Sequence, residues 1–199
     1  MAEVRSTSPQ GRPRDAAVDR AVLRATQELL AEMSYDRLSI DAIAVRSGVA
    51  RTSIYRRWDT KFDVVRDALL AIRPIHEFAD TGSLRDDLLT YFDPKHAVLG
   101  VRSLFIGIVG QLHTNPDLAK FIDDYFIVPG TKVMREMFER AIARGEVRED
   151  IDLEILARVL PAMMWERRLF GRGRKLDSDY VRRVVDEVVV PLTRLVTAQ

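Results

Sequence analysis

A short stretch in the first third of the chain carries the side-chain types that proteins use to contact DNA. Residues 50–58 contain three arginines, a threonine, a serine and a tyrosine, and no acidic residue. An arginine can bond both acceptors of a guanine edge, and hydroxyl groups bond phosphates or base edges. The predicted DNA contacts are therefore Arg51, Thr52, Ser53, Tyr55, Arg56 and Arg57, on the outer side of a short helix.

Basic residues are concentrated in the same region. The 199 residues include 31 Lys and Arg against 30 Asp and Glu, so the total charge says nothing about a polyanionic partner. Residues 46–61, however, hold five basic residues and one acidic residue. This local excess indicates a polyanion site confined to that stretch, and a solvated helix face is the alternative.

Short helices are expected to position these side chains. The first begins near Asp15, and the second covers residues 40–46 with Ser39 as its N-cap. Gly48 suits the sharp turn before a third helix over residues 51–57. Two short helices joined in this way form a helix-turn-helix, whose second helix fits the major groove. The residues expected to pack these helices onto the first are Ile40, Ile43, Ala44, Val49 and Ile54.

The remainder of the chain has apolar residues at helical spacing, so the predicted fold is all-α. Pro129-Gly130 and Pro161 are expected to interrupt two of the helices. Residues 104–109 and 188–190 are rich in β-branched side chains and could form strands, but they lie inside longer helical patterns, which favours buried helix. The expected helices cover residues 61–73, a segment that starts at Ser83, and residues 96–113, 117–144, 153–170 and 179–196.

The chain is predicted to have three parts. Residues 1–14 form a flexible arm, residues 15–74 a helix-turn-helix DNA-binding domain, and residues 75–199 a helical bundle. A small DNA-binding unit does not need the long bundle in order to fold. The bundle is therefore expected to dimerise the protein, to bind a ligand, or to do both.

Several classes of protein are excluded by the composition. The chain has no cysteine, which removes disulfides and thiolate chemistry, and no apolar run approaches the ~18 residues of a membrane helix. The N-terminus lacks the apolar core of a signal peptide, so we expect a cytoplasmic protein. The three histidines, His76, His96 and His113, lack metal-ligand spacing, and no phosphate-binding glycine loop occurs. We expect no catalysis, no metal and no cofactor.

The sequence from Gly48 to Lys61 reads Gly-Val-Ala-Arg-Thr-Ser-Ile-Tyr-Arg-Arg-Trp-Asp-Thr-Lys. It resembles the signature of the TetR family of transcriptional repressors, which is roughly Gly-Val-Ser-x-x-Thr-Leu-Tyr-x-x-Phe-x-Ser-Lys. The likeness covers residues 19–70 closely, and the helical segmentation beyond is similar in kind. The Arg-Gly-Glu-Val-Arg junction at residues 144–148 is also a common feature of that family.

The resemblance implies roles on the recognition helix. Arg51 and Thr52 would read bases at its start. Ser53 and Tyr55 would bond phosphates or base edges. For Tyr55 the alternative is an aromatic plug between helices.

The resemblance implies further roles at the edges of the motif. Arg56 and Arg57 would flank the groove, and Lys61 would meet a phosphate, although a solvated lysine is the alternative. Ser39 could hold a phosphate on the free backbone N–H groups at the start of the second helix. Trp58 stands where the family usually has Phe and is expected in the core.

The chain departs from the family pattern at two positions. Ser34 replaces a turn glycine, and a left-handed conformation there would cost roughly 1 kcal/mol. Ala50 replaces the Ser or Thr that caps the third helix. The missing cap would lower the stability of that helix by about 1 kcal/mol. In the N-terminal arm, Arg12 and Arg14 resemble a minor-groove arm, and a basic tail is the alternative.

A homodimer through the last two helices is expected because two recognition helices one DNA turn apart, ~34 Å, can read a palindrome. Each of these helices has an apolar stripe, and the alternative is that both stripes fill the core of the monomer. The stripes are Leu153, Leu156, Val159, Leu160 and Met163, and Tyr180, Val184, Val188, Leu192 and Leu195.

A small-molecule pocket is expected between helices of the bundle. Methionine and aromatic side chains suit adaptable apolar binding, although such a set is also typical of plain core. The candidate lining residues are Phe105, Val109, His113, Phe126, Met134, Met137, Met163, Met164 and Trp165, with Gln111, His113, Tyr125 and Glu166 as polar candidates.

The sequence therefore predicts a DNA-binding transcriptional regulator that represses from a palindromic operator and is released by a small apolar or amphipathic ligand. One alternative is a helical small-molecule-binding or enzymatic domain with a vestigial DNA-binding unit. Another is an interaction module whose third helix binds a protein.

Overall fold

The computed structural model describes residues 16–72, 78, 80–93, 105, 107–171 and 176–194. The regular elements in these ranges are all helices, which confirms the predicted fold class. The N-terminal unit contains α1 (Ala16–Glu32), α2 (Ile40–Ser47), α3 (Arg51–Tyr55) and α4 (Lys61–Leu70). The later elements are α5 (Leu84–Tyr91), α7 (Pro116–Ile122), η2 (Asp123–Ile127), α8 (Val128–Ala143), α9 (Leu153–Phe170), α10 (Ser178–Val184), η3 (Val185–Val189) and α11 (Val190–Arg194). The predicted arm, the boundary at residue 74 and the start of the helix predicted from His96 lie outside the described residues.

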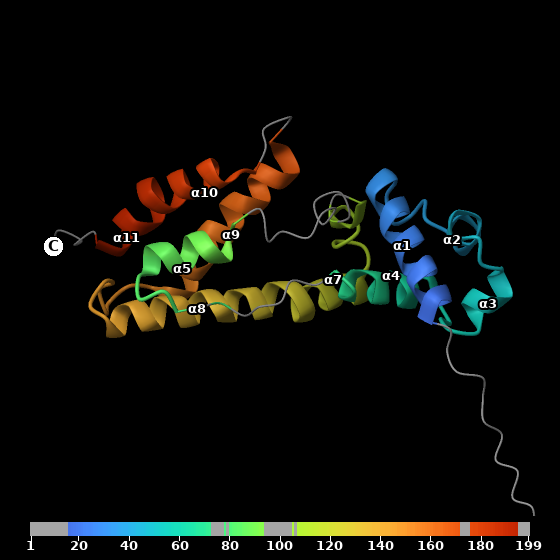
Figure 1. The fold of residues 1–199 in the computed structure, drawn as a ribbon, viewed down its shortest axis with the longest axis horizontal. Helices are drawn as coiled ribbons and strands as arrows, with labels where there is room; N and C mark the ends of the chain where they lie inside the picture. The colour runs from blue at the N-terminus through green and yellow to red at the C-terminus, as the bar shows by residue number, and fades with distance from the viewer. Residues whose placement is uncertain are drawn as a thin grey trace, which may run out of the picture.

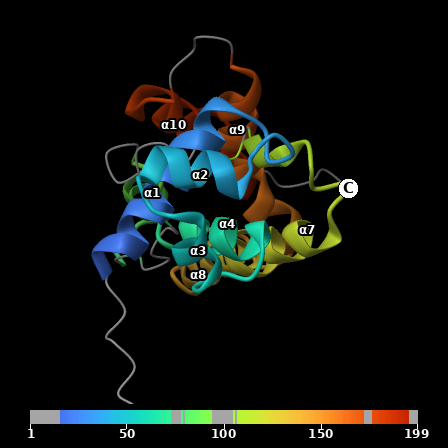
Figure 2. The same ribbon diagram turned by 90° about the vertical axis from the view of Figure 1, so that its right-hand side faces the viewer.

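The molecule is elongated, with the N-terminal unit at one end and the C-terminal helices at the other (Figure 1). The helix formed by α7, η2 and α8 runs between the two ends. α5 and α9 lie beside the far half of α8, and α10 packs on α5 and α9. Figure 2 looks onto the N-terminal unit and shows α2 and α3 at the end of the molecule. This end is therefore open to a large partner.

Capping residues explain where the helices of the N-terminal unit begin and end. The Oγ atom of Ser39 accepts the Ala42 N–H at 3.1 Å, and Gly48 ends α2 with a left-handed φ of 70°. Thr60 and Asp63 form a reciprocal capping box at the start of α4. These boundaries confirm the predicted ones within a few residues.

Two expected backbone features are wrong. Within the described residues only glycines have a positive φ, so Ser34 adopts no left-handed conformation and the predicted cost does not arise. The predicted interruption of the helix at Pro161 is absent, because α9 continues from Leu153 to Phe170. The buried residues Ala157, Leu160 and Met164 hold α9 on both sides of the proline.

The helical interpretation of the β-branched stretches is correct where they are described. Phe105 and residues 107–109 are helical, and residues 188–190 lie where η3 passes into α11. The interruption predicted at Pro129-Gly130 occurs one turn earlier, as the π-helix η2. This places Pro129 in the first turn of α8, where its missing N–H is tolerated.

The apolar side chains form two cores, and the first extends beyond the N-terminal unit. It joins residues of α1 to α4 with Phe105, Ile108 and buried side chains of α7 and η2. Backbone contact is close, because the Tyr35 N–H donates to the Gly107 carbonyl at 2.8 Å. A Cβ atom at Gly107 would overlap the Leu30 carbonyl oxygen, so only glycine fits there. The N-terminal unit is therefore seated directly on the following helices.

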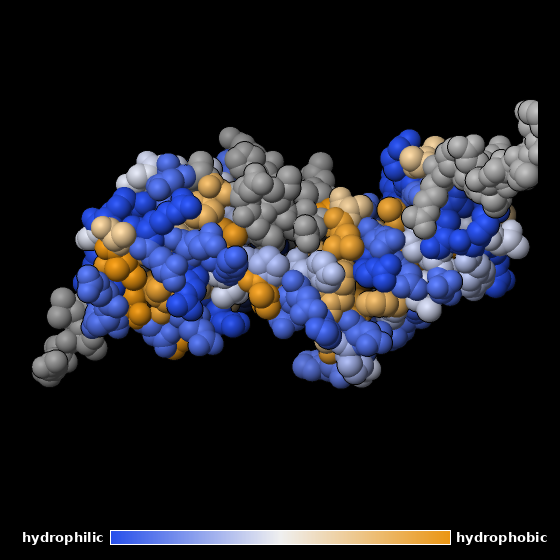
Figure 3. Space-filling view, turned by 90° about the horizontal axis from the view of Figure 1, so that it is seen from below, coloured by the Kyte–Doolittle hydropathy of each residue, from blue (hydrophilic) through white to orange (hydrophobic). Residues whose placement is uncertain are grey.

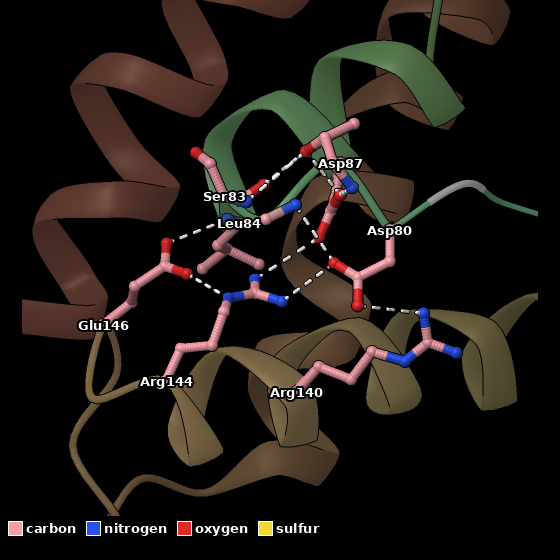
Figure 4. Close-up of polar contacts among 9 residues, drawn as sticks. Asp80, Ser83, Leu84, Asp87, Arg140, Arg144 and Glu146 are labelled. Carbon is pink, nitrogen blue, oxygen red and sulfur yellow. Dashed lines mark hydrogen bonds and ion pairs between the residues drawn. The ribbon is translucent and has the colours of Figure 1, made fainter.

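The second core lies between α5, α8, α9, α10 and η3, and a group of charged side chains closes its edge. Arg144, at the end of α8, lies between Asp80, the fully buried Asp87 and Glu146 (Figure 4). Glu146 also accepts the Leu84 N–H at 2.8 Å. These contacts fix α5 against the turn between α8 and α9.

Candidate nucleic-acid interface

The recognition helix α3 is held by two buried apolar side chains. Ile54 is fully buried and Trp58 nearly so, and both belong to the first core. The Nε1–H of Trp58 donates to Asp67 at 2.8 Å, which agrees with its predicted place in the core. The opposite side of α3 carries Arg51, Thr52, Tyr55 and Arg56, all exposed. The side chain of Tyr55 is 45% exposed, which contradicts the alternative of an aromatic plug.

Arg51 is the first residue of α3 and has neighbours on both sides. Its Nε atom lies 2.8 Å from the Oδ1 atom of Asp41 in the first turn of α2. Its guanidinium carbon lies 5.9 Å from the ring centroid of Tyr55, one turn further along α3. The sequence pattern does not point to Asp41 as a partner of Arg51, because an acid in a first turn is already explained by the helix dipole.

Arg57 is mostly buried and has partners within the N-terminal unit. Its side chain is only 11% exposed, and its Nε–H donates to Asp19 of α1 at 2.6 Å. A terminal amino group of Arg57 donates to the Ser53 carbonyl at 3.0 Å. The last turn of α3 turns this side chain toward α1, so Arg57 fixes the angle between the two helices, and its contact with DNA stays a prediction.

Lys61 also points inward, toward the turn after α1. Its Nζ atom donates to the Tyr35 carbonyl at 2.9 Å and lies 4.2 Å from the centroid of the Tyr35 ring. Burial lowers the pKa of Lys61, and nearby Asp36 only partly opposes this. The amine therefore ties the start of α4 to the turn after α1 and is not a solvated lysine, and its contact with a phosphate stays a prediction.

The two remaining predicted contacts have structural partners as well. The Ser39 hydroxyl caps α2, and Ser53 is half-buried beside Arg57. Neither arrangement tests a contact with DNA, so DNA binding by these two residues stays a prediction.

Ala50 precedes α3 and gives it no side-chain cap, as the sequence predicts. We expect Ala50→Ser to raise the free energy of unfolding by about 1 kcal/mol, because the hydroxyl can accept a free N–H of the first turn. Urea unfolding measures the gain. Ala50→Val, which offers no acceptor, is the control, and an equal midpoint for the two variants would contradict the prediction.

The predicted ligand-binding residues do not form one group. Phe105, Phe126 and Trp165 lie together, with ring centroids 5.4 Å apart for Phe105–Phe126 and 4.6 Å apart for Phe105–Trp165. Val109 and His113 are exposed on the surface, so they do not line a pocket with these rings. The methionines are in or against the second core: Met134, Met137 and Met164 are buried and Met163 is partly buried.

The polar candidates also lie toward the surface. Tyr125 and Glu166 are exposed, and the side-chain amide of Gln111 donates to Asp36 in the turn after α1. Gln111 therefore helps to seat the N-terminal unit on the bundle.

Much of the proposed dimer stripes is buried in the monomer. Leu156, Leu160 and Val184 belong to the second core, which is the alternative left open above. Other apolar side chains of the C-terminal helices remain at the surface: Ile155 is 64%, Phe170 71% and Leu192 37% exposed. Figure 3 shows hydrophobic surface beneath the C-terminal helices and near the middle of the molecule. Leu195 lies outside the described residues.

The described ranges offer no helix that is long and apolar enough to cross a membrane. The same ranges contain no cluster of three His, Cys, Asp or Glu residues suited to a metal ion.

Two protein-family models match this chain. Residues 22–68 match the model described as bacterial regulatory proteins, tetR family, and residues 78–188 match the tetracyclin repressor-like C-terminal domain. The first match covers the predicted helix-turn-helix, and the second covers more than half of the chain.

Similar proteins cover nearly the whole length. The chain is 30% identical over 178 residues to the DNA-binding transcriptional repressor TetR of Mycobacteroides abscessus, covering 87% of this chain and 93% of that protein. It is 29% identical over 181 residues to the uncharacterized HTH-type transcriptional regulator YdeS of Bacillus subtilis, covering 89% and 91%. The fold is similar to that of Salmonella enterica GusR, with a TM-score of 0.69, 19% identity and coverage of 92% and 99%. The chain belongs to the TetR family of helix-turn-helix, DNA-binding transcriptional regulators.

Proposed function

We propose that this protein is a cytoplasmic, homodimeric repressor that binds a palindromic operator and is released from it by a small apolar or amphipathic ligand. The observation that carries the proposal is the outer side of α3, where Arg51, Thr52, Tyr55 and Arg56 are exposed while Ile54 anchors the helix. These are side chains that read base edges and bond phosphates. The name of the Mycobacteroides abscessus relative supports repression.

A dimer follows from how such a helix reads DNA. One short recognition helix covers few base pairs, whereas two copies about 34 Å apart reach successive major grooves on one side of the duplex. The exposed apolar side chains of α9 and α11, Ile155, Phe170 and Leu192, support an interface on these C-terminal helices.

The aromatic side chains in and against the first core support a ligand-responsive switch. Phe105 contacts both Phe126 and Trp165 of α9, and the Phe126 ring lies 6.0 Å from that of Phe121. The Phe121 ring lies 6.1 Å from Phe62 at the start of α4. A ligand that moves these rings would shift α4 and with it α3, which changes the spacing of the two recognition helices.

The test is a gel-shift measurement with the DNA that flanks the protein's own gene. We expect a discrete complex that survives excess random competitor DNA, and a dimer by sedimentation at the same protein concentration. Binding that disappears with the competitor would contradict sequence-specific repression. A monomer that still binds the fragment specifically would contradict the homodimer alone.

A further inference from the structure

Asp41 and Arg51 form an ion pair across the exposed side of the helix-turn-helix. The Asp41 Oδ1 atom lies 2.8 Å from the Arg51 Nε atom, and the two side chains are 62% and 57% exposed. An exposed pair of this kind contributes little to folding stability. Its main consequence is therefore the position that it gives to the guanidinium of Arg51.

The geometry of the pair suits base recognition. Guanine is read by two parallel N–H groups of arginine, which bond its O6 and N7 atoms. Asp41 approaches Arg51 at Nε, and the two terminal amino groups, here called the fork of Arg51, are the groups that would bond the guanine edge. The Tyr55 ring, 5.9 Å from the guanidinium carbon, limits the side chain on a second side. A long side chain held in this way loses less conformational entropy when it binds.

The charge of Asp41 acts on the rest of the duplex. A carboxylate beside the reading helix repels phosphates, which weakens contacts that do not depend on sequence. The same carboxylate remains paired with Arg51 while the two terminal amino groups bond a base. The complex with the correct site therefore loses less binding free energy to this repulsion than a non-specific complex does. A group that repels the wrong ligand, here non-specific DNA, can in this way increase specificity for the right one.

We propose that Asp41 is a positioning residue for base recognition, which directs the fork of Arg51 toward the base edge and disfavours non-specific binding. This inference rests on the proposed function, because it takes Arg51 as the residue that reads a base. It adds a residue of α2, which makes no base contact itself, to the determinants of operator choice.

The test is selection of binding sites from a library of randomised DNA duplexes with the full-length protein and its variants. The wild type is expected to enrich a palindrome, and Arg51→Ala to lose preference at one base pair in each half-site. Asp41→Asn should reduce the preference at that same base pair by roughly tenfold and leave the other positions unchanged. Asp59→Asn is the matched control, because it removes the same charge from an exposed position of the same unit and should leave every preference intact.

Two further variants separate positioning from a general loss of structure. Asp41→Glu keeps the carboxylate and should retain most of the preference. In an Arg51→Ala background, Asp41→Asn should have no further effect at that base pair. Thermal melting of each variant checks that the domain is folded.

The outcomes distinguish the inference from the function on which it rests. A wild type that enriches a site while Asp41→Asn keeps every base preference overturns the role of Asp41 and leaves the regulator intact. Uniformly tighter binding by Asp41→Asn, equal to that of Asp59→Asn, also overturns it, because charge alone then explains the effect. A wild type that enriches no sequence overturns the proposed function and the role of Asp41 together.

Discussion

Replacing Arg144 by alanine is expected to lower the free energy of unfolding by about 3 kcal/mol, the lower end of the range for breaking a buried ion pair. Asp87 is fully buried and would lose its cation, which lies 3.4 Å away. The Thr81 N–H and hydroxyl, which both donate to Asp87, cannot neutralise the charge. The lower end of that range applies because the Arg144 side chain is 25% exposed. Water can therefore enter in the variant and partly solvate the Asp87 carboxylate.

Urea unfolding of the full chain measures this loss, with Arg135→Ala as the control. Arg135 pairs with Glu139 on the open face of α8, where an ion pair contributes little. Adding Asp87→Asn to Arg144→Ala should restore part of the stability, because it removes the buried charge. Equal midpoints for Arg144→Ala and Arg135→Ala would contradict the structural role of the buried pair.

The same group of charges predicts a pH dependence. Burial alone would raise the pKa of Glu146, but the bonds from Arg144 and from the Leu84 N–H outweigh it and hold that pKa below its ordinary value. A carboxylate with a lowered pKa stabilises the fold above its unfolded pKa, and this contribution is lost as the pH falls through the folded value. We expect the free energy of unfolding to decrease as the pH drops below the ordinary pKa of glutamate. The decrease should be less steep in Glu146→Gln. Parallel pH profiles of the two proteins would contradict this.

Arg51→Ala is expected to cost about 1–3 kcal/mol in binding to the operator and to relax the preference at one base position. Arg51 is exposed at the start of α3, and its fork is the group that can bond a guanine edge. Arg56→Ala, which removes the same charge from the exposed end of the motif, should weaken binding to all sequences alike. Titrations against the operator and against single-base variants separate these two effects, and an unchanged base preference in Arg51→Ala would show that another residue reads that position.

The sequence predicts well those features that depend on local chemistry. Ser39 and Gly48 specify the ends of α2 through a side-chain cap and backbone freedom, and the structure confirms both. Apolar spacing likewise identifies Ile54 as the anchor of α3. Family membership confirms the prediction of a regulator and not an enzyme.

Features that depend on long-range packing could not be predicted in the same way. Arg57 and Arg56 are neighbours of the same type, and only the approach of Asp19, 38 residues away, turns Arg57 inward. The inward position of Lys61 likewise depends on the turn at Tyr35. The extension of the first core to Phe105 and Phe121 joins segments far apart in the sequence, which no local pattern specifies.

Selection from a randomised duplex library with the unmodified protein would show whether it is a dimeric, sequence-specific DNA-binding protein. We expect enrichment of a palindrome whose half-sites lie about 10 base pairs apart, because two copies of α3 would enter successive major grooves. Enrichment of no sequence, or of a single unrepeated site bound by one copy, would contradict this expectation.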